Sequence, residues 1–313
     1  MSIQNDSKSN RLRTFPGVQA IRNFLKDTRA KTGIIIFTFF SLIAILAPVL
    51  TPYNPNDNNF VPLTPPSLQH WLGTTGNGQD VFSQFVWGAR TSLSIGLLAG
   101  LISTVLSVLI GMYPGYRGGW MDRIFDTITN VFLVIPSLPL IIVISSYVHS
   151  AGPWVIVFVI GLTGWAGGAR VLRAQTLTYR NRDFISAAKL GGSSELRILV
   201  WEIVPNMLSL IISNFMFGTL GAILAEAGLE FLGLGNVSVV SWGTMLYWSD
   251  SGGALLMGAW WWLLPEGLAI ALFGMSLALM NFGIDQLTNP RLRSDSLNKK
   301  KARIKRRESN ANI

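Results

Sequence analysis

Residues 91–116 read TSLSIGLLAGLISTVLSVLIGMYPGY and contain no charged side chain. A helix needs about 20 consecutive apolar residues to cross the hydrocarbon core of a bilayer, so this stretch predicts a membrane span. Within it, Gly96 and Gly100 form a Gly-x-x-x-Gly pair. This spacing lets a second helix approach closely, although it is also common by chance in apolar runs. The chain is therefore expected to be an all-α integral membrane protein.

The composition of the whole chain supports this class. Half of the 313 residues are hydrophobic and 13% are charged, against about 25% in soluble domains. The net charge of +9 could indicate a nucleic-acid binder. However, the basic residues lie in short stretches between apolar runs and are not gathered on a soluble face, so we expect no nucleic-acid partner. The absence of cysteine excludes disulfides, thiolate metal sites and a cysteine nucleophile.

Outward from this stretch, the apolar runs predict six spans in a lipid bilayer. Residues 127–169 are charge-free but too long for one helix, and a polar break at 147–153 divides them. Pro136 and Pro139 are expected to kink the third span, either beside a polar pathway or as a bend that neighbouring helices accommodate. The six spans are expected at residues 33–50, within 91–116, in the two halves of 127–169, at 203–225 and at 267–284.

Lys and Arg decide the orientation, because they accumulate on the cytoplasmic side of a membrane protein. With the N-terminus inside, the inside segments hold 24 of the 25 Lys and Arg residues. The remaining one is Arg90, at the edge of the second span. Both termini are therefore expected in the cytoplasm. A cleavable signal peptide is not expected, because a polar stretch precedes the first apolar run.

The longest inward segment, residues 170–202, predicts a short helix held across the cytoplasmic mouth. Asp183 can cap this helix, and the pair Gly191-Gly192 ends it. Phe184 and Ile185 would then face water, which a plain connecting loop does not require. An apolar helix on this surface predicts docking with a partner, and the alternative is a simple connection.

A second short helix is expected to follow. Ser193 or Ser194 can cap it, and Glu195 falls in its first turn, where an acidic side chain is favourable. Pro205 then interrupts or restarts the helix where the chain enters the membrane. Arginines surround this surface at Arg180, Arg182 and Arg197.

No catalytic motif is recognisable. The dipeptide Gly-Lys never occurs, so the chain has no Gly-x-x-x-x-Gly-Lys-Ser/Thr phosphate loop. The two histidines, His70 and His149, lack metal-ligand spacing and are interpreted as interfacial polar residues. The chain is therefore expected to be neither an enzyme nor a metal protein.

Acidic and aromatic side chains mark the other side of the membrane. Glu226 and Glu230 follow the fifth span and Glu266 precedes the core of the sixth. Such residues either line a solute path or have ordinary solvated or hydrogen-bonded roles near the outer interface. Trp242 and Trp248 belong to an aromatic cluster in the last outer loop, which is either an interfacial belt or a stacking surface for sugar rings. The other members of this cluster are Tyr247, Trp260, Trp261 and Trp262.

One family matches these features. The pattern Ser186-Ala187-Ala188-x-x-x-Gly192, followed further on by Val204-Pro205, resembles the EAA loop of ABC importer permeases. That loop reads Glu-Ala-Ala-x-x-x-Gly and later Ile-x-Leu-Pro. In this chain Ser186 replaces the leading Glu, Glu202 the Ile and Val204 the Leu.

Further stretches are similar to the dipeptide, oligopeptide and nickel branch of these permeases, and to its second-permease type. They are HWLGT at 70–74, GQDV at 78–81, GARTSL at 88–93, GYRGGWMD at 115–122, FLGLG at 231–235, SWG at 241–243 and NPRLR at 289–293. Together they cover most of the chain.

The resemblance implies the type I ABC importer permease fold with six transmembrane helices, in a bacterial or archaeal inner membrane. The expected parts are a cytoplasmic N-terminal segment, a first span with its outer loop, a core permease domain with five spans, and a basic cytoplasmic tail. Their expected ranges are 1–31, 32–90, 91–290 and 291–313.

The resemblance also implies partners and sites. A homologous second permease shares the pathway, an extracytoplasmic binding protein delivers the solute, and two ATP-binding subunits hold ATP and Mg, while this chain holds no cofactor. Each ATP-binding subunit receives one coupling helix, and the Ser186 departure leaves open the salt bridge that the family's Glu would make. The coupling helix and its exit are expected at Arg182, Asp183, Phe184, Ile185, Ser186, Ala187, Ala188, Leu190, Gly191, Gly192, Glu195 and Leu196. A pathway or outer gate is expected at Trp242, Trp248, Glu226 and Glu230.

The solute is expected to be a di- or oligopeptide or an oligosaccharide. The alternative from another functional class is an ion-coupled secondary transporter that acts alone. Such a transporter would need buried charges at mid-span and usually an internal repeat, and the sequence shows neither clearly.

Overall fold

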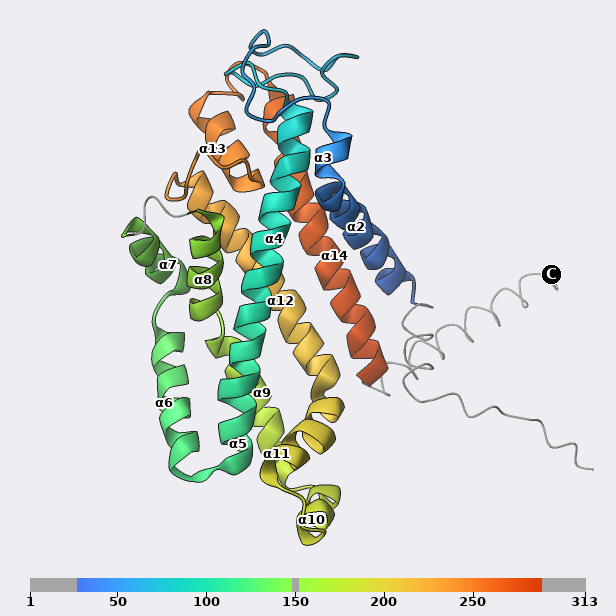
Figure 1. The fold of residues 1–313 in the computed structure, drawn as a ribbon, viewed down its shortest axis with the longest axis vertical. Helices are drawn as coiled ribbons and strands as arrows, with labels where there is room; N and C mark the ends of the chain where they lie inside the picture. The colour runs from blue at the N-terminus through green and yellow to red at the C-terminus, as the bar shows by residue number, and fades with distance from the viewer. Residues whose placement is uncertain (1–26, 148–151, 289–313) are drawn as a thin grey trace, which may run out of the picture.

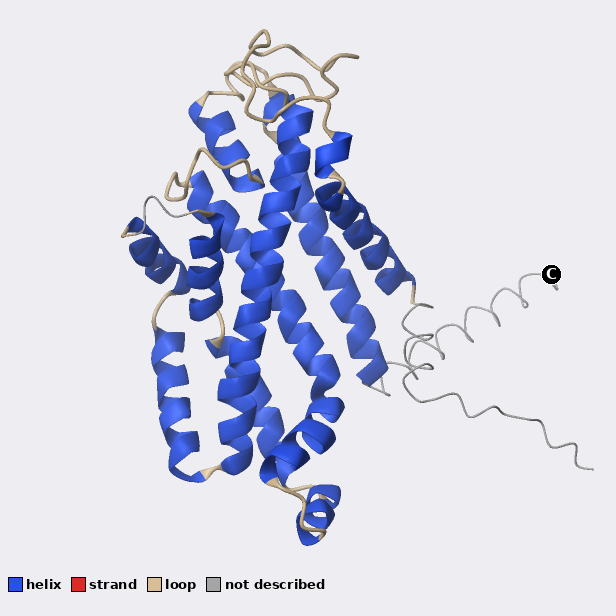
Figure 2. Ribbon diagram, viewed as in Figure 1, coloured by secondary structure: helices blue, strands red, loops and turns tan. Residues whose placement is uncertain are grey.

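The computed structural model of the chain describes residues 27–147 and 152–288. In this part of the chain every regular element is a helix, and the helices form an elongated bundle (Figure 1). Irregular segments gather at one end of the bundle, and the short helix α10 projects at the other (Figure 2). We call these the loop end and the α10 end. Of the expected terminal segments, residues 1–26 and 291–313 lie outside the described residues, as does His149.

The helices carry the labels of Figure 1. In chain order the α-helices are α2 (Thr28–Ile45), α3 (Ala47–Leu50), α4 (Val81–Ser107), α5 (Tyr113–Arg117), α6 (Gly119–Val134), α7 (Ser137–Ser146), α8 (Pro153–Thr163), α9 (Ala166–Arg180), α10 (Asp183–Leu190), α11 (Glu195–Ile198), α12 (Val204–Phe231), α13 (Trp242–Ser251) and α14 (Leu264–Thr288). Two π-helices, η1 (Val108–Met112) and η2 (Leu199–Ile203), and one 3-10 helix, η3 (Trp260–Trp262), lie between them.

The prediction of about six spans is confirmed, with one of them broken. In the described residues, five helices are long and apolar enough to cross a membrane, and α6 with α7 supplies a sixth that bends by 84°. Pro136 causes the bend, because a residue before proline is driven out of the helical region and Ile135 is extended (ψ 123°). Pro139 lies in the first turn of α7, where a missing N–H costs little.

Several spans are longer than the apolar runs predicted. Helix α4 begins at Val81 and not within 91–116, because the Asp80 carboxylate accepts a 2.8 Å bond from the Ser83 N–H and starts the helix there. Helix α9 continues to Arg180, so the expected loop from Arg170 is wrong in its first part. Hydropathy detects only the membrane-embedded part of a helix, and these helices extend beyond it.

Pro205 restarts the α-helix, as one of the two expected outcomes, but it does not interrupt the helical path. Helical structure runs from Glu195 to Phe231, and the π-helix η2 joins α11 to α12. Pro205 is the second residue of α12. The wider π turn, with bonds from residue i to i+5, precedes it directly. In the first turn of α12 the missing N–H of Pro205 costs little.

Helices α4 and α12 cross at the Gly-x-x-x-Gly pair. A Cβ added at Gly100 would lie 2.8 Å from the Thr219 Cα, and one added at Gly96 would collide with the side chain of Ile223. The two glycines therefore allow the helices to approach more closely than any other residue would permit. The packing role suggested by this sequence motif is confirmed.

This crossing generates a test. Gly100→Ala should lower the thermal unfolding midpoint of the purified chain in detergent, by an overpacking cost of about 1–3 kcal/mol. Gly221→Ala is the matched control in α12, because a Cβ there meets nothing within 4 Å, and alanine favours a helix over glycine. Equal midpoints for the two variants would contradict the close crossing.

Candidate functional site

Helix α10 projects from the bundle at the α10 end (Figure 1). Arg182 occupies the N-cap position without a side-chain bond, so the expected cap at Asp183 is wrong; Asp183 lies in the first turn, where its charge favours the helix. Gly192 ends the helix with a positive φ of 77°, and the Ser193 N–H bonds the Ala188 carbonyl at 3.1 Å. Gly191-Gly192 terminates the helix as predicted.

The next helix begins as predicted. Ser194 caps α11 by accepting a bond of 3.4 Å from the Arg197 N–H, and Glu195 lies in the first turn. Glu195 also reaches Arg117 of α5 at 4.0 Å. Both side chains of this pair are at least half exposed, so the pair adds little to stability.

Ile185 is the one buried residue of α10. It is fully enclosed in a group of apolar side chains that we call the α10-end cluster, and the expectation that it faces water is wrong. The reason lies in the tertiary structure. The chain turns back at α10, and Ile185 packs in a cluster with residues of α5, α9 and the α11–α12 helix. The buried members of the α10-end cluster are Met112, Tyr116, Leu172, Ile185, Ile198, Leu199, Ile203 and Met207.

Two further contacts hold α10 to the bundle. Ala188, one turn after Ile185, packs against the same cluster, and the Lys189 ammonium lies 5.4 Å from the centre of the Tyr116 ring. Of the alanines expected to allow close approach by a partner, only Ala187 is exposed, because Ala188 is turned towards the bundle.

The rest of α10 and the start of α11 are open. On α10, Leu190 is 91% exposed and Phe184 40%, beside the exposed Asp183, and Leu196 of α11 is 61% exposed. Ser186 and Ala187 are also exposed, as are Arg182 and Arg197. Large apolar side chains on a helix outside the apolar bundle mark a surface for protein contact.

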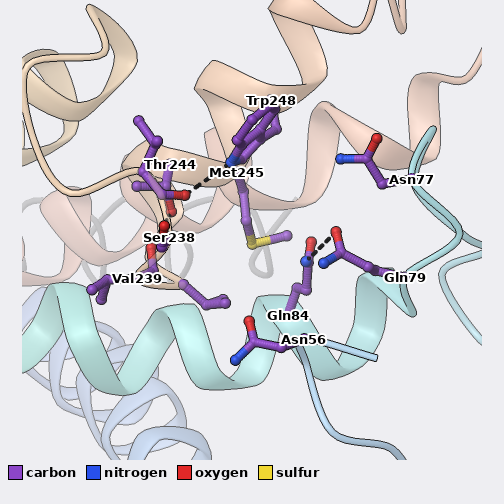
Figure 3. Close-up of a pocket in the computed structure, with 11 residues that line it drawn as sticks. Asn56, Asn77, Gln79, Gln84, Ser238, Val239, Thr244, Met245 and Trp248 are labelled. Carbon is purple, nitrogen blue, oxygen red and sulfur yellow. Dashed lines mark hydrogen bonds between the residues drawn. The ribbon is translucent and has the colours of Figure 1, made fainter. Parts of the chain in front are cut away.

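At the loop end, a pocket of about 390 Å³ lies between two segments far apart in the chain. One wall comes from Asn56, Asn77, Gln79 and Gln84, and the other from residues 237–240 with Thr244, Met245 and Trp248 (Figure 3). We call this the loop-end pocket. Its amide side chains were not predicted as a site from the sequence, because they are scattered over residues 56–84 and only Gln79 falls in a quoted stretch, GQDV at 78–81.

Trp242 is not at this surface. It is fully buried, its indole N–H donates to the Phe85 carbonyl at 3.1 Å, and its ring lies 5.6 Å from that of Phe40. Its expected place in an aromatic belt or on a stacking surface is therefore wrong. Trp248 does border the loop-end pocket, and its indole N–H donates to the Val237 carbonyl at 3.0 Å.

Glu226 and Glu230 lie inside the last turns of α12 and are both buried, not solvated. Ser92 of α4 donates to Glu226 at 3.0 Å and accepts from the backbone N–H of Trp242 at 3.1 Å. Ser241, which caps α13, donates to Glu230. These four side chains tie α4, α12 and α13 together. Glu266 is equally buried in the first turn of α14.

A second pocket, of about 300 Å³, lies within the bundle between α4, α7, α8 and α12. Glycine and alanine form much of its lining, and its polar groups include Ser103, Thr163 and Asn214. Among the described residues that line it, none carries a formal charge.

Comparisons with known proteins agree with this architecture. Residues 103–294 match the family described as binding-protein-dependent transport system inner membrane component, and residues 16–66 match the N-terminal transmembrane domain of oligopeptide transport permease C. The chain is 33% identical to the dipeptide transport system permease protein DppC of Bacillus subtilis over 276 residues, which are 88% of this chain and 85% of the relative.

Other relatives carry similar names. The oligopeptide transport system permease protein OppC of Mycobacterium tuberculosis is 33% identical over 277 residues, covering 88% of this chain and 94% of the relative. A putative peptide permease protein of Brucella suis is 32% identical over 280 residues, covering 89% and 92%.

The serine that joins α4 to α13 generates a test. Ser92→Ala should destabilise the chain by about 1–3 kcal/mol, because it leaves the Trp242 N–H and one Glu226 oxygen buried without their partner. Ser94→Ala, on the exposed side of the same helix, should have no measurable effect. Thermal unfolding of both variants in detergent compares the two, and equal midpoints would show that the bridge contributes nothing.

Proposed function

The chain belongs to the family of binding-protein-dependent transport system inner membrane components, and on that premise we propose that α10 is the helix through which a cytoplasmic ATPase drives it. The family makes the chain a membrane permease of an ABC importer. The buried position of Ile185 beside the exposed side chains of Phe184 and Leu190 carries the proposal. One face of α10 binds the bundle and the other is free for a partner.

The mechanism follows from this two-faced packing. The α10-end cluster contains residues of both π-helices, Met112 of η1 and Leu199 and Ile203 of η2. Displacement of α10 by a closing ATPase therefore acts through Ile185 on the two long helices that cross at Gly100. The transporter alternates between two conformations, and a ligand shifts the equilibrium between them only by binding one conformation more tightly than the other. ATP binding to the partner supplies this difference, since the chain has no phosphate loop.

The assembly we propose has four further chains. Two ATP-binding subunits, which bind ATP and Mg, dock at the α10 end. A homologous second permease completes the pathway, and an extracytoplasmic binding protein delivers solute at the loop end. The α10 end and both termini lie in the cytoplasm in this proposal, which the Lys and Arg distribution supports. The membrane that we propose is a bacterial or archaeal inner membrane, as the family implies.

Peptides are the solute that we propose, because the relatives are named for dipeptide, oligopeptide and peptide transport. An oligosaccharide has less support, since the expected stacking residue Trp242 is buried.

The alternative, an ion-coupled transporter acting alone, draws on one observation. Three buried carboxylates, Glu226, Glu230 and Glu266, lie in membrane-spanning helices. They occupy the last turns of α12 and the first turn of α14 and not the middle of a span, which favours a role in joining helices at the loop end.

Docking is tested by a charge on the exposed face of α10. Leu190→Asp should abolish co-purification of the ATP-binding subunits with the tagged chain in mild detergent, without loss of folding, because Leu190 is 91% exposed. Leu68→Asp, 97% exposed in the loop region at the other end, is the matched control and should retain them. Recovery of the ATP-binding subunits with Leu190→Asp would reject the proposal. So would an unmodified chain that carries ion-driven flux and never co-purifies with an ATP-binding subunit.

Transmission is tested at the buried face. Ile185→Ala leaves a cavity that costs about 2–5 kcal/mol, which should loosen α10 from the bundle while its exposed face still docks. We expect the number of solute molecules imported per ATP hydrolysed in vesicles to fall, with the ATPase still bound. Ile185→Val should retain most of the coupling, since it removes one methyl group at a cost of about 0.5–1.5 kcal/mol. Normal coupling in Ile185→Ala would show that force does not pass through this contact.

A further inference from the structure

The loop-end pocket has the dimensions of a ligand site. Its volume of about 390 Å³ falls within the range of about 300–1,000 Å³ that is usual for small-molecule pockets. Its walls come from two segments more than 150 positions apart, so the site exists only in the folded chain. Figure 3 shows Gln79 and Gln84 on one side, Thr244 and Trp248 on the other, and Met245 between them.

The lining is polar but uncharged. Four carboxamide side chains face the pocket, and among the described residues that line it none carries a formal charge. A carboxamide both donates and accepts hydrogen bonds. Such a lining fits a neutral ligand that also presents donors and acceptors, as peptide amide groups and sugar hydroxyls do. It gives an ionic ligand no counter-charge.

Part of this hydrogen-bonding capacity is already used. The Gln84 amide donates to the Gln79 side-chain oxygen at 3.0 Å and to the Pro55 carbonyl at 3.1 Å. In the described part of the chain, the structure gives the side chains of Asn56 and Asn77 no hydrogen bond. Water therefore solvates these two amides, and a ligand can replace it with direct bonds.

The amide wall is rigid. The Thr75 hydroxyl accepts from the Asn77 and Gln79 backbone N–H groups at 3.2 and 3.1 Å. Gly78, with φ of 73°, fits so closely against the Phe60 carbonyl that a Cβ would collide with it. Asp80, the residue after Gln79, lies 2.9 Å from the His70 ring nitrogen Nδ1 and fixes this end of the wall. His70 is thus a buried structural residue and not an interfacial one.

The facing wall is rigid as well. Ser241 and Thr244 form a capping box at the start of α13, and the Trp248 indole is bonded to the Val237 carbonyl. Because both walls are fixed before any ligand arrives, little ordering cost opposes binding.

We infer that the loop-end pocket binds a neutral segment of the transported solute, through its amide or hydroxyl groups, before that solute enters the membrane. This inference rests on the proposed function for the direction of transport. The pocket within the bundle is likewise uncharged, so a neutral segment meets no formal charge in either pocket.

The test places a charge in the pocket by isosteric substitution. The full-length chain in lipid nanodiscs is titrated with tripeptides blocked at both termini, Ala-Gln-Ala, Ala-Lys-Ala and Ala-Glu-Ala, and with a neutral trisaccharide, and binding is read by saturation-transfer NMR. The unmodified chain should bind neutral probes better than either charged peptide. Asn77→Asp and Gln79→Glu should each favour the Lys peptide over the Glu peptide by about tenfold, from one nearby charge at intermediate dielectric.

Asn59→Asp is the matched control, because Asn59 is exposed in the same loop region but does not line the pocket. It should leave the ratio between the two charged peptides unchanged. Preference for the blocked Gln peptide over the trisaccharide, or the reverse, identifies which neutral chemistry is bound. The inference would be overturned if the ratio of Lys-peptide to Glu-peptide binding shifted equally in Asn77→Asp, Gln79→Glu and Asn59→Asp. It would also be overturned if the unmodified chain bound no neutral probe.

Binding in nanodiscs needs neither ATP nor partner subunits, so the two proposals fail separately. Selective binding without ATP-driven uptake by the assembled transporter would contradict the proposed function and leave the pocket as a ligand site. ATP-driven uptake with no binding at the pocket would support the proposed function and overturn the inference about the pocket.

Discussion

The close crossing of α4 and α12 at Gly96 and Gly100 fixes the positions of the other elements. Each helix belongs to a continuous helical segment of 37 residues, about 55 Å long at 1.5 Å per residue, and longer than the bilayer core of about 30 Å. Their ends must therefore project beyond the membrane. At one end they meet in the α10-end cluster. At the other, Ser92 of α4 bonds Glu226 of α12.

This geometry connects the two regions for which we propose functions. Ile185 joins α10 to both long segments at their π-helices, and Gln84 near the start of α4 lines the loop-end pocket. π-helices occur often at functional sites, where they mark irregular turns of a helix. The two π-helices contribute Met112, Leu199 and Ile203 to the α10-end cluster, and we propose that movement of α10 passes through them to the regular helices beyond.

Much of the fold could be predicted from the sequence because apolar length and turn chemistry are local properties. The spans, the proline bend at Pro136, the glycine stop at Gly192 and the Ser194 cap all follow from neighbouring residues. The direction in which Ile185 and Trp242 face could not, because it depends on partners distant in the chain, as in the bond that the Trp242 backbone N–H donates to the Ser92 hydroxyl. The loop-end pocket was missed for the same reason.

We propose that α10 contacts an ATPase while Ile185 holds it to the bundle. The chain has no cysteine, so a single cysteine at Leu190 gives a unique attachment point for a short thiol crosslinker in the assembled transporter. We expect crosslinks from Leu190→Cys to an ATP-binding subunit and none from Leu68→Cys. A transport-active assembly in which Leu190→Cys reaches only lipid, the second permease or the extracytoplasmic binding protein would contradict it.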